Sequence, residues 1–149
     1  MEKVLIINGP NLNLLGNREK NFYGKTTLNN IKLICEEQCK KNKIECNFLQ
    51  TNHEGELIEN IHLATNDYAG IIINPAAYTH TSIAILDALR AINKPKIEVH
   101  ISNIYAREDY RRKSVTSEAV DGIICGFGEQ GYALAIDAIK NLIHNKNND

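Results

Sequence analysis

Two histidines follow short apolar segments and are candidates for proton transfer. His80 lies in the stretch NPAAYTHTS (residues 74–82), and His100 lies two residues after Glu98 in the stretch EVHISN (residues 98–103). The ordinary pKa of histidine is about 6.5, so an imidazole can donate or accept a proton near neutral pH. A structural role is the alternative for each ring, since His80 could cap a helix and His100 could simply pair with Glu98.

Amide, hydroxyl and guanidinium groups extend this set. Asn11, Asn74 and Ser102 each follow an apolar segment, and Arg18 and Arg111 lie in polar stretches that come after two such segments. Amides bind hydroxyl or carboxylate groups, and arginines bind carboxylates. We therefore expect acid–base work on a polar small molecule.

Tyr23 lies five residues after Arg18 in the long polar stretch NGPNLNLLGNREKNFYG (residues 8–24). The ordinary pKa of a phenol is about 10, so tyrosine acts as a base near neutral pH only when a nearby cation lowers that value. Arg18 is the candidate cation. An ordinary loop aromatic is the alternative interpretation of Tyr23.

Other reaction classes lack their signatures. The chain contains neither a G-x-S-x-G nucleophile elbow nor a G-x-x-x-x-G-K-[ST] phosphate loop, so acyl transfer by a serine and phosphoryl transfer are not expected. A zinc site needs three or four close ligands, and only two histidines are candidates here, so no metal is expected. The four cysteines lack a C-x-x-C spacing, and we expect buried thiols in a reducing compartment.

The composition is that of an ordinary globular domain. Hydrophobic residues make up 43%, charged residues 23%, and the formal net charge is -1, which lacks the basic excess of a nucleic-acid-binding protein. The chain shows no apolar run of membrane-spanning length. We expect one domain over residues 1–149, in the cytoplasm, that binds neither nucleic acid nor membrane.

Five apolar, β-branched segments alternate with segments of helical spacing. The predicted strands are residues 4–8, 45–50, 70–74, 96–100 and 122–126. This alternation predicts an α/β fold, a flavodoxin-like doubly wound five-stranded parallel sheet of order 2-1-3-4-5 in three layers. Ligands of such sheets bind at the carboxyl ends of the strands, at the switch point between the first and third strands. The candidate polar residues are expected to converge there.

The stretch GFGEQG (residues 126–131) matches the pattern G-x-G-x-x-G. In a dinucleotide-binding unit this pattern precedes a further strand with an acidic residue about 20 positions on. Here only one helical segment and a polar tail come after it. The glycines therefore predict a tight strand-to-helix turn and no cofactor.

Five stretches, in order along the chain, resemble those of type II 3-dehydroquinate dehydratases (type II dehydroquinases). They are INGPNLNLLG (7–16), YGKTTL (23–28), INPAAYTHTSIAILDAL (73–89), EVHISN (98–103) and GFGEQGYALA (126–135). The resemblance implies a cofactor-free lyase that dehydrates 3-dehydroquinate to 3-dehydroshikimate by anti elimination through an enolate. It also implies the shikimate pathway, which leads to chorismate and the aromatic amino acids.

The resemblance implies catalytic roles for five residues. Tyr23 would be the base, and Arg18 would lower its pKa, both on a flap over the substrate. His100 would be the general acid that protonates the leaving hydroxyl, with Glu98 orienting its ring. Asn11 would help to hold the water that stabilises the enolate oxygen.

The resemblance also implies binding roles. Asn74, His80 and Arg111 would contact the ring hydroxyls or the carboxylate of the substrate. The backbone amides of Ile101 and Ser102 would receive the carboxylate.

Asp87 is a solvated helix residue on the sequence alone. By resemblance it reaches into the site of a neighbouring subunit, which implies a homo-oligomer, a dodecamer of four trimers. Lys20 departs from the family, whose flaps usually carry a proline at this place.

Several alternatives remain open at this point. The same reaction could serve quinate catabolism, or the chain could be a non-catalytic module that binds small polyol acids. A flavodoxin would need a hydroxyl-rich phosphate loop after the first strand. A response-regulator receiver would need acids where Asn8 and Asn74 stand.

Overall fold

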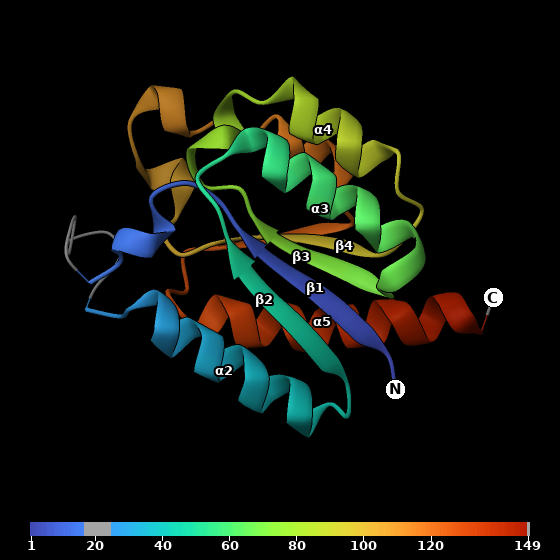
Figure 1. Cartoon of the computed structure of the whole chain (residues 1–149). Helices are drawn as coiled ribbons and strands as arrows, with labels where there is room; N and C mark the ends of the chain where they lie inside the picture. Colours follow the sequence, from blue (N-terminus) through green and yellow to red (C-terminus); the bar gives the residue numbers. More distant parts are fainter. Residues whose placement is uncertain (17–24, 149) are drawn as a thin grey trace.

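Five parallel strands form one sheet in the order β2-β1-β3-β4-β5 (Figure 1). The computed structural model describes residues 1–16 and 25–148. The strands are β1 (Lys3–Asn8), β2 (Glu45–Gln50), β3 (Gly70–Asn74), β4 (Lys96–His100) and β5 (Gly122–Cys125). The predicted fold class and strand order are confirmed, and only the start of β1 and the end of β5 differ, each by one residue.

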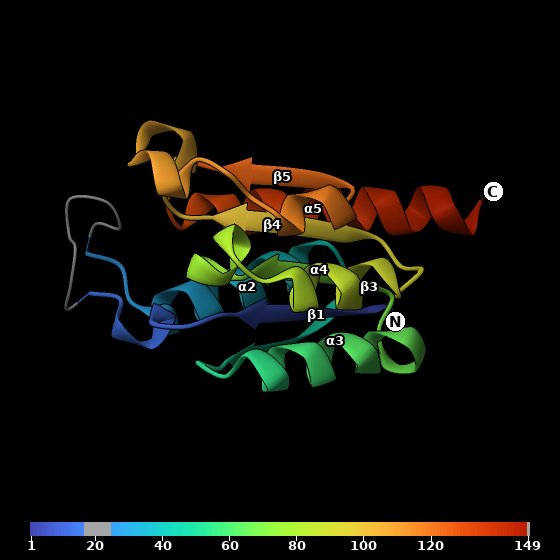
Figure 2. The same cartoon turned by 90° about the horizontal axis from the view of Figure 1, so that it is seen from above.

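In the described residues, two helices cover each face of the sheet, which gives the three predicted layers (Figures 1 and 2). One face carries α2 (Leu28–Lys41) and α5 (Gln130–Asn147), and the other carries α3 (Glu54–Asp67) and α4 (Ile83–Arg90). None of the helices in the described part of the chain has the length and apolar character needed to cross a membrane.

The described parts of the connections contain five short 3-10 helices. They are η1 (Leu12–Leu14), η2 (Ala76–His80), η3 (Ile104–Ala106), η4 (Asp109–Arg111) and η5 (Thr116–Ala119). The first comes after β1, the second after β3, and η3, η4 and η5 lie in that order between β4 and β5. The irregular backbone is therefore concentrated beyond the carboxyl ends of the central strands.

The continuous apolar runs of the strands reflect burial on both faces. In β1, Val4 and Ile6 belong to the apolar cluster beneath α2 and α5, whereas Leu5 and Ile7 belong to the cluster beneath α3 and α4. Successive side chains of a strand point to opposite faces, and both faces of a doubly wound sheet are covered. All four side chains are consequently buried completely.

The GFGEQG stretch forms the connection from β5 to α5. Gly126 and Gly128 have φ angles of 95° and 60°, a left-handed conformation that glycine adopts without steric cost. A Cβ atom at Gly131 would lie 3.2 Å from Cγ2 of Val99 in β4. The prediction of a tight turn with close helix–sheet packing is confirmed.

A buried hydrogen-bonded triad joins the carboxyl ends of β1 and β3 to α5. The hydroxyl of Tyr132 donates to Oδ1 of Asn8 at 2.6 Å and accepts from Nδ2 of Asn74 at 2.9 Å. Asn8 and Asn74 are register partners in the sheet. Burial raises the pKa of the Tyr132 phenol, so the hydroxyl keeps its proton.

Replacing Tyr132 with phenylalanine should destabilise the fold. The substitution leaves a buried amide oxygen and a buried amide N–H without the hydroxyl, and we expect the free energy of unfolding to fall by about 1–3 kcal/mol. Urea unfolding of Tyr132→Phe measures this loss. Tyr105→Phe is the matched control, because the Tyr105 side chain is 52% exposed, and equal stability of the two variants would contradict the prediction.

Candidate active site

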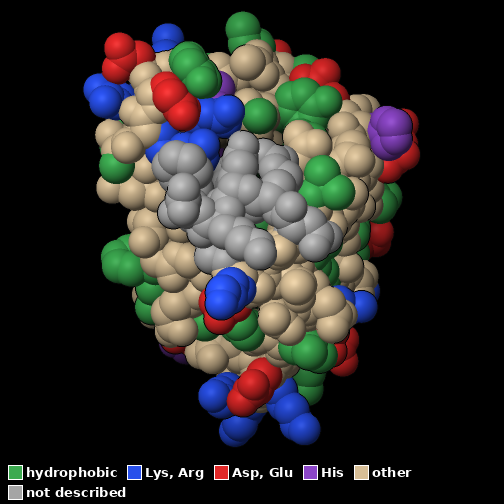
Figure 3. Space-filling view, turned by 90° about the vertical axis from the view of Figure 1, so that its left-hand side faces the viewer, with side chains coloured by type: hydrophobic (Ala, Val, Ile, Leu, Met, Phe, Trp, Pro, Cys, Tyr) green, Lys and Arg blue, Asp and Glu red, His purple; other side chains and the backbone are tan. Residues whose placement is uncertain are grey.

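A pocket of about 130 Å³ lies at the carboxyl ends of β1, β3 and β4, the switch point of the sheet. Figure 3 looks onto this end of the molecule, where one group of Lys and Arg side chains lies at the upper left and another at the lower edge. The structure brings seven of the candidate residues together in the lining of this pocket. They are Asn11, Asn74, His80, His100, Ile101, Ser102 and Arg111.

Close approach of the ends of β1 and β3 forms the floor of this region. The N–H of Gly9 donates to the carbonyl oxygen of Asn74 at 2.8 Å. A Cβ atom at Gly9 would lie 2.6 Å from the carbonyl oxygen of Pro75, so only glycine fits here. Asn11, two residues after Gly9, has a φ angle of 69°, a conformation that asparagine tolerates better than most residues.

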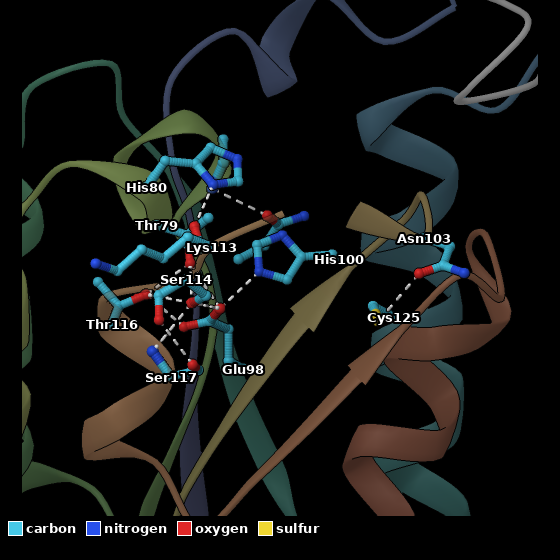
Figure 4. Close-up of polar contacts among 12 residues, drawn as sticks. Thr79, His80, Glu98, His100, Asn103, Lys113, Ser114, Thr116, Ser117 and Cys125 are labelled. Atoms are coloured by element: carbon cyan, nitrogen blue, oxygen red, sulfur yellow. Dashed lines mark hydrogen bonds and ion pairs between the residues drawn. The ribbon is translucent and has the colours of Figure 1, made fainter. Parts of the chain in front are cut away.

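His80 is held by the main chain of the segment that comes after β4. Its Nδ1 lies 2.7 Å from the carbonyl oxygen of Lys113 (Figure 4). A carbonyl oxygen can only accept, so Nδ1 carries the proton. In the neutral ring, Nε2 is therefore an acceptor that is available to a ligand.

His100 uses the opposite nitrogen. Its Nε2 lies 2.6 Å from Oε2 of Glu98, and both side chains are buried (Figure 4). An ionised carboxylate can only accept, so Nε2 carries a proton. This arrangement leaves Nδ1 of His100 as the nitrogen available to the pocket.

The charged form of Glu98 is favoured by its hydrogen bonds. Burial alone would raise the pKa of its carboxyl, but the hydrogen bond and charge of His100 and the hydroxyls of Thr116 and Thr79 outweigh burial. The pKa of Glu98 consequently lies below its ordinary value.

Three hydroxyl groups surround this carboxylate, and none of them was a candidate from the sequence. Thr79 and Ser114 contact Oε2 at 2.7 and 3.0 Å, and Thr116 donates to Oε1 at 2.5 Å. The stretches around them are rich in Ser and Thr. That composition is common in loops, and no spacing ties these residues to Glu98.

Two arginines give the pocket a positive side. Arg111 is half-buried, with Nε 2.7 Å from Oε2 of Glu108. Arg107, which was not a candidate from the sequence, is buried and also lines the pocket. The described lining contains no carboxylate, so the pocket is suited to an anionic ligand. The charged run that begins at Arg107 was the signal that could have found this residue.

Two described candidates do not line this pocket. Asp87 is exposed on α4, and Glu98 lies behind His100 rather than in the lining. Arg18 and Tyr23 lie outside the described residues, as does Lys20.

The other histidines and the cysteines lie outside the pocket lining. His53, His62 and His144 are exposed. All four cysteines are free; Cys35 and Cys39 are buried and the other two half-buried.

Comparison with known proteins identifies close relatives. The sequence model of the family described as dehydroquinase class II matches residues 2–140. A 3-dehydroquinate dehydratase of Clostridium botulinum is 53% identical over 148 residues, covering 99% of this chain and 97% of the relative. One of Rhizobium meliloti is 52% identical over 139 residues, covering 93% and 94%. The crystal structure of a type II dehydroquinase from Butyrivibrio crossotus superposes with a TM-score of 0.90 at 49% identity, covering 93% of this chain and 97% of that one.

The lowered pKa of Glu98 should make its contribution to stability depend on pH. The ionised carboxylate stabilises the fold above its ordinary pKa of 4.5, and this contribution is lost as the pH falls through the lower, folded-state pKa. We therefore expect the stability gap between the wild type and Glu98→Gln to narrow from pH 6 to pH 3, by about 1.4 kcal/mol for each unit of pKa shift.

Urea unfolding at each pH measures the two free energies. Glu59→Gln, at an exposed position on α3, is the control and should track the wild type. A gap between wild type and Glu98→Gln that stays constant over this range would contradict the assignment of an ionised, hydrogen-bonded Glu98.

Proposed function

Because this chain belongs to the class II dehydroquinase family, we propose that its pocket binds 3-dehydroquinate and dehydrates it to 3-dehydroshikimate. One observation carries the proposal: His80, His100 and Arg111 line a single pocket in a chain that is 53% identical to a 3-dehydroquinate dehydratase. We assign the step to the shikimate pathway. The free state of the cysteines supports action in the reducing cytoplasm.

The reaction needs three groups and no cofactor. A base removes the proton next to the ketone, a hydrogen-bond donor stabilises the enolate, and an acid protonates the departing hydroxyl. One C–H bond and one C–O bond break, while a C=C bond and an O–H bond of the departing water form. Proton transfers alone therefore balance the reaction. No electron carrier is required.

His100 is the general acid of this proposal. Nε2 of His100 donates to Oε2 of Glu98 at 2.6 Å. Nδ1 of the protonated ring is therefore the nitrogen that donates its proton to the leaving hydroxyl of the substrate as the C–O bond breaks. The hydroxyl leaves as water, and the ring becomes the neutral Nε2–H tautomer. The ionised Glu98 compensates the charge that the ring carries before the transfer.

The base and the enolate-stabilising group are assigned by family resemblance. Tyr23, as a phenolate stabilised by Arg18, takes the proton next to the ketone. Asn11, which lines the pocket, helps to hold the water that donates to the enolate oxygen. Tyr23 and Arg18 lie outside the described residues, so these roles rest on the matching sequence stretches.

The remaining lining residues bind the substrate in this proposal. Arg111 and the backbone amides of Ile101 and Ser102 receive the carboxylate. His80 accepts a hydrogen bond from a ring hydroxyl through Nε2. Asn74 uses one N–H on Tyr132, and its second N–H can serve a hydroxyl of the substrate.

We also propose a homo-oligomer, a dodecamer of four trimers, in which Asp87 completes the site of a neighbouring subunit. Asp87 is exposed on α4 and does not line the described pocket of its own chain. An exposed carboxylate on the helix that comes after η2 suits this role, since His80 ends η2 and lines the pocket.

The function is tested with 3-dehydroquinate itself. The wild type should produce 3-dehydroshikimate, and the ultraviolet absorbance of its enone measures the rate. Tyr23→Phe and His100→Ala should each lose about 10²–10⁴-fold in kcat, the usual contribution of a general base or acid. Tyr105→Phe should turn over like the wild type. An inert wild type would refute the lyase and favour a non-catalytic binding module, and full activity of Tyr23→Phe would refute the base.

Subunit mixing tests the role of Asp87. Asp87→Asn and His100→Ala should each be impaired, and co-refolding of the two should raise activity above both parents, because a mixed site takes His100 from one chain and Asp87 from another. Sedimentation should give about 200 kDa for twelve chains of 16.7 kDa each. Absence of recovery in a mixture that forms mixed oligomers would show that Asp87 does not act across subunits.

A further inference from the structure

Thr116 is a completely buried residue that begins η5 (Thr116–Ala119). Its hydroxyl lies 2.5 Å from Oε1 of Glu98 and 2.7 Å from the hydroxyl of Thr79. Thr116 does not line the pocket. Thr116 and His100 lie on opposite sides of the Glu98 carboxylate, so Thr116 contacts the acid–base pair from outside the pocket lining (Figure 4).

The two oxygens of Glu98 have different partners. Oε2 is shared by Nε2 of His100 and the hydroxyls of Thr79 and Ser114. Among the described residues, Thr116 provides the hydrogen bond to Oε1. A carboxylate rotates about the bond to its methylene group, so a donor on Oε1 sets the plane in which Oε2 meets the imidazole.

Hydrogen bonds of the neighbouring residues help to hold Thr116 in place, in addition to its own contact with Glu98. The N–H of Val115 donates to the carbonyl oxygen of Thr79 at 2.7 Å. The N–H of Ser117 donates to the hydroxyl of Ser114 at 3.1 Å, and the Ser117 hydroxyl donates to the Ser114 carbonyl at 3.0 Å. The hydroxyl of Thr116 is thus presented to the carboxylate by a hydrogen-bonded turn.

A threonine hydroxyl at this point has one proton and can also accept. When Thr116 donates to Oε1, its oxygen can accept the one hydroxyl proton of Thr79 at 2.7 Å, in which case His100 and Ser114 remain as the donors to Oε2. Donation to a charged acceptor is stronger than donation to a neutral hydroxyl. The proton of Thr116 is therefore directed to Glu98.

We propose that Thr116 is a positioning residue for the acid–base reaction: its hydroxyl fixes the carboxylate plane of Glu98 and thereby aims Nδ1 of His100 at the leaving hydroxyl. Its kinetic consequence rests on the proposed dehydratase function. The hydroxyl does not touch the substrate, so its loss lowers the rate of proton transfer without removing a binding contact.

Three variants distinguish loss of the Thr116 hydroxyl from loss of side-chain packing at this position. Thr116→Val keeps the shape and removes the hydroxyl, so kcat should fall by about tenfold while KM stays within about twofold, the pattern of a contact that acts in the transition state. Thr116→Ser keeps the hydroxyl and should restore kcat to within about threefold of the wild type. Glu118→Gln is the control in the same 3-10 helix, because the exposed Glu118 side chain pairs with Arg90 and takes no part in holding Thr116 or Glu98.

Each rate is divided by the concentration of folded enzyme. The folded fraction of each variant is obtained from its unfolding transition. If Thr116→Val does not fold, Thr116→Ala makes the same comparison without a methyl group beside the carboxylate. In the Glu98→Gln background the loss of the Thr116 hydroxyl should change kcat less than twofold, because it acts through the carboxylate. A tenfold loss that persists in that background, or an unchanged kcat in Thr116→Val, would overturn the proposal.

A substrate-free measurement distinguishes failure of this inference from failure of the proposed function. Nitrogen-15 spectra, with the His100 signals assigned by comparison with His100→Ala, should show the neutral ring as the Nε2–H tautomer in the wild type. Thr116→Val should show a mixture of tautomers, and Thr116→Ser should not. If the wild type fails to turn over 3-dehydroquinate while the spectra behave in this way, the function is wrong and the positioning stands. An unchanged tautomer in Thr116→Val would overturn the positioning whatever the activity.

Discussion

The buried carboxylate of Glu98 is the group on which the rest of the site depends. An isolated charge in a protein interior is strongly destabilising, and it is tolerated only when hydrogen bonds and an opposite charge replace water. Here the replacements come from separate parts of the chain: His100 on the same strand, Thr79 in η2, and Ser114 and Thr116 in the segment before β5. Packing these segments around the carboxylate satisfies a requirement of folding, and the same packing orients the proposed acid.

The parallel sheet determines where that carboxylate can act. Both faces of the sheet are covered by helices, so its polar chemistry is confined to the ends of the strands. The triad of Asn8, Asn74 and Tyr132 ties the ends of β1 and β3 to α5. In this way the helix on one face, which takes no part in the pocket lining, still fixes the register of the two strands on which the pocket is built.

The extent to which the sequence predicts this arrangement depends on the range of the interactions. Runs such as Ile71 to Ile73 are local signals, so the strands, their order and the meeting place of Asn74 and His100 could be predicted. The contacts of Thr79 and Thr116 with Glu98 could not be predicted. Thr116 and Glu98 are 18 residues apart in the sequence, and only folding brings them together. The role of Asp87 comes from family resemblance alone, whereas the spacing of Arg18 and Tyr23 already indicates Tyr23 as a candidate base. The GFGEQG stretch is the opposite case, because its closely spaced glycines are a local signal of the tight turn that the structure shows.

The two histidines of the pocket differ because of the atoms behind them. His80 has a neutral carbonyl oxygen at its Nδ1, whereas His100 has an ionised carboxylate at its Nε2. Both partners fix a tautomer, but only the carboxylate compensates a full positive charge on the ring. A ring that must hold a transferable proton is therefore better placed at His100, and a ring that accepts a hydrogen bond from a bound hydroxyl is better placed at His80. This difference distinguishes the proposed acid from the proposed binding residue, and it arises from main-chain and carboxylate contacts outside the lining.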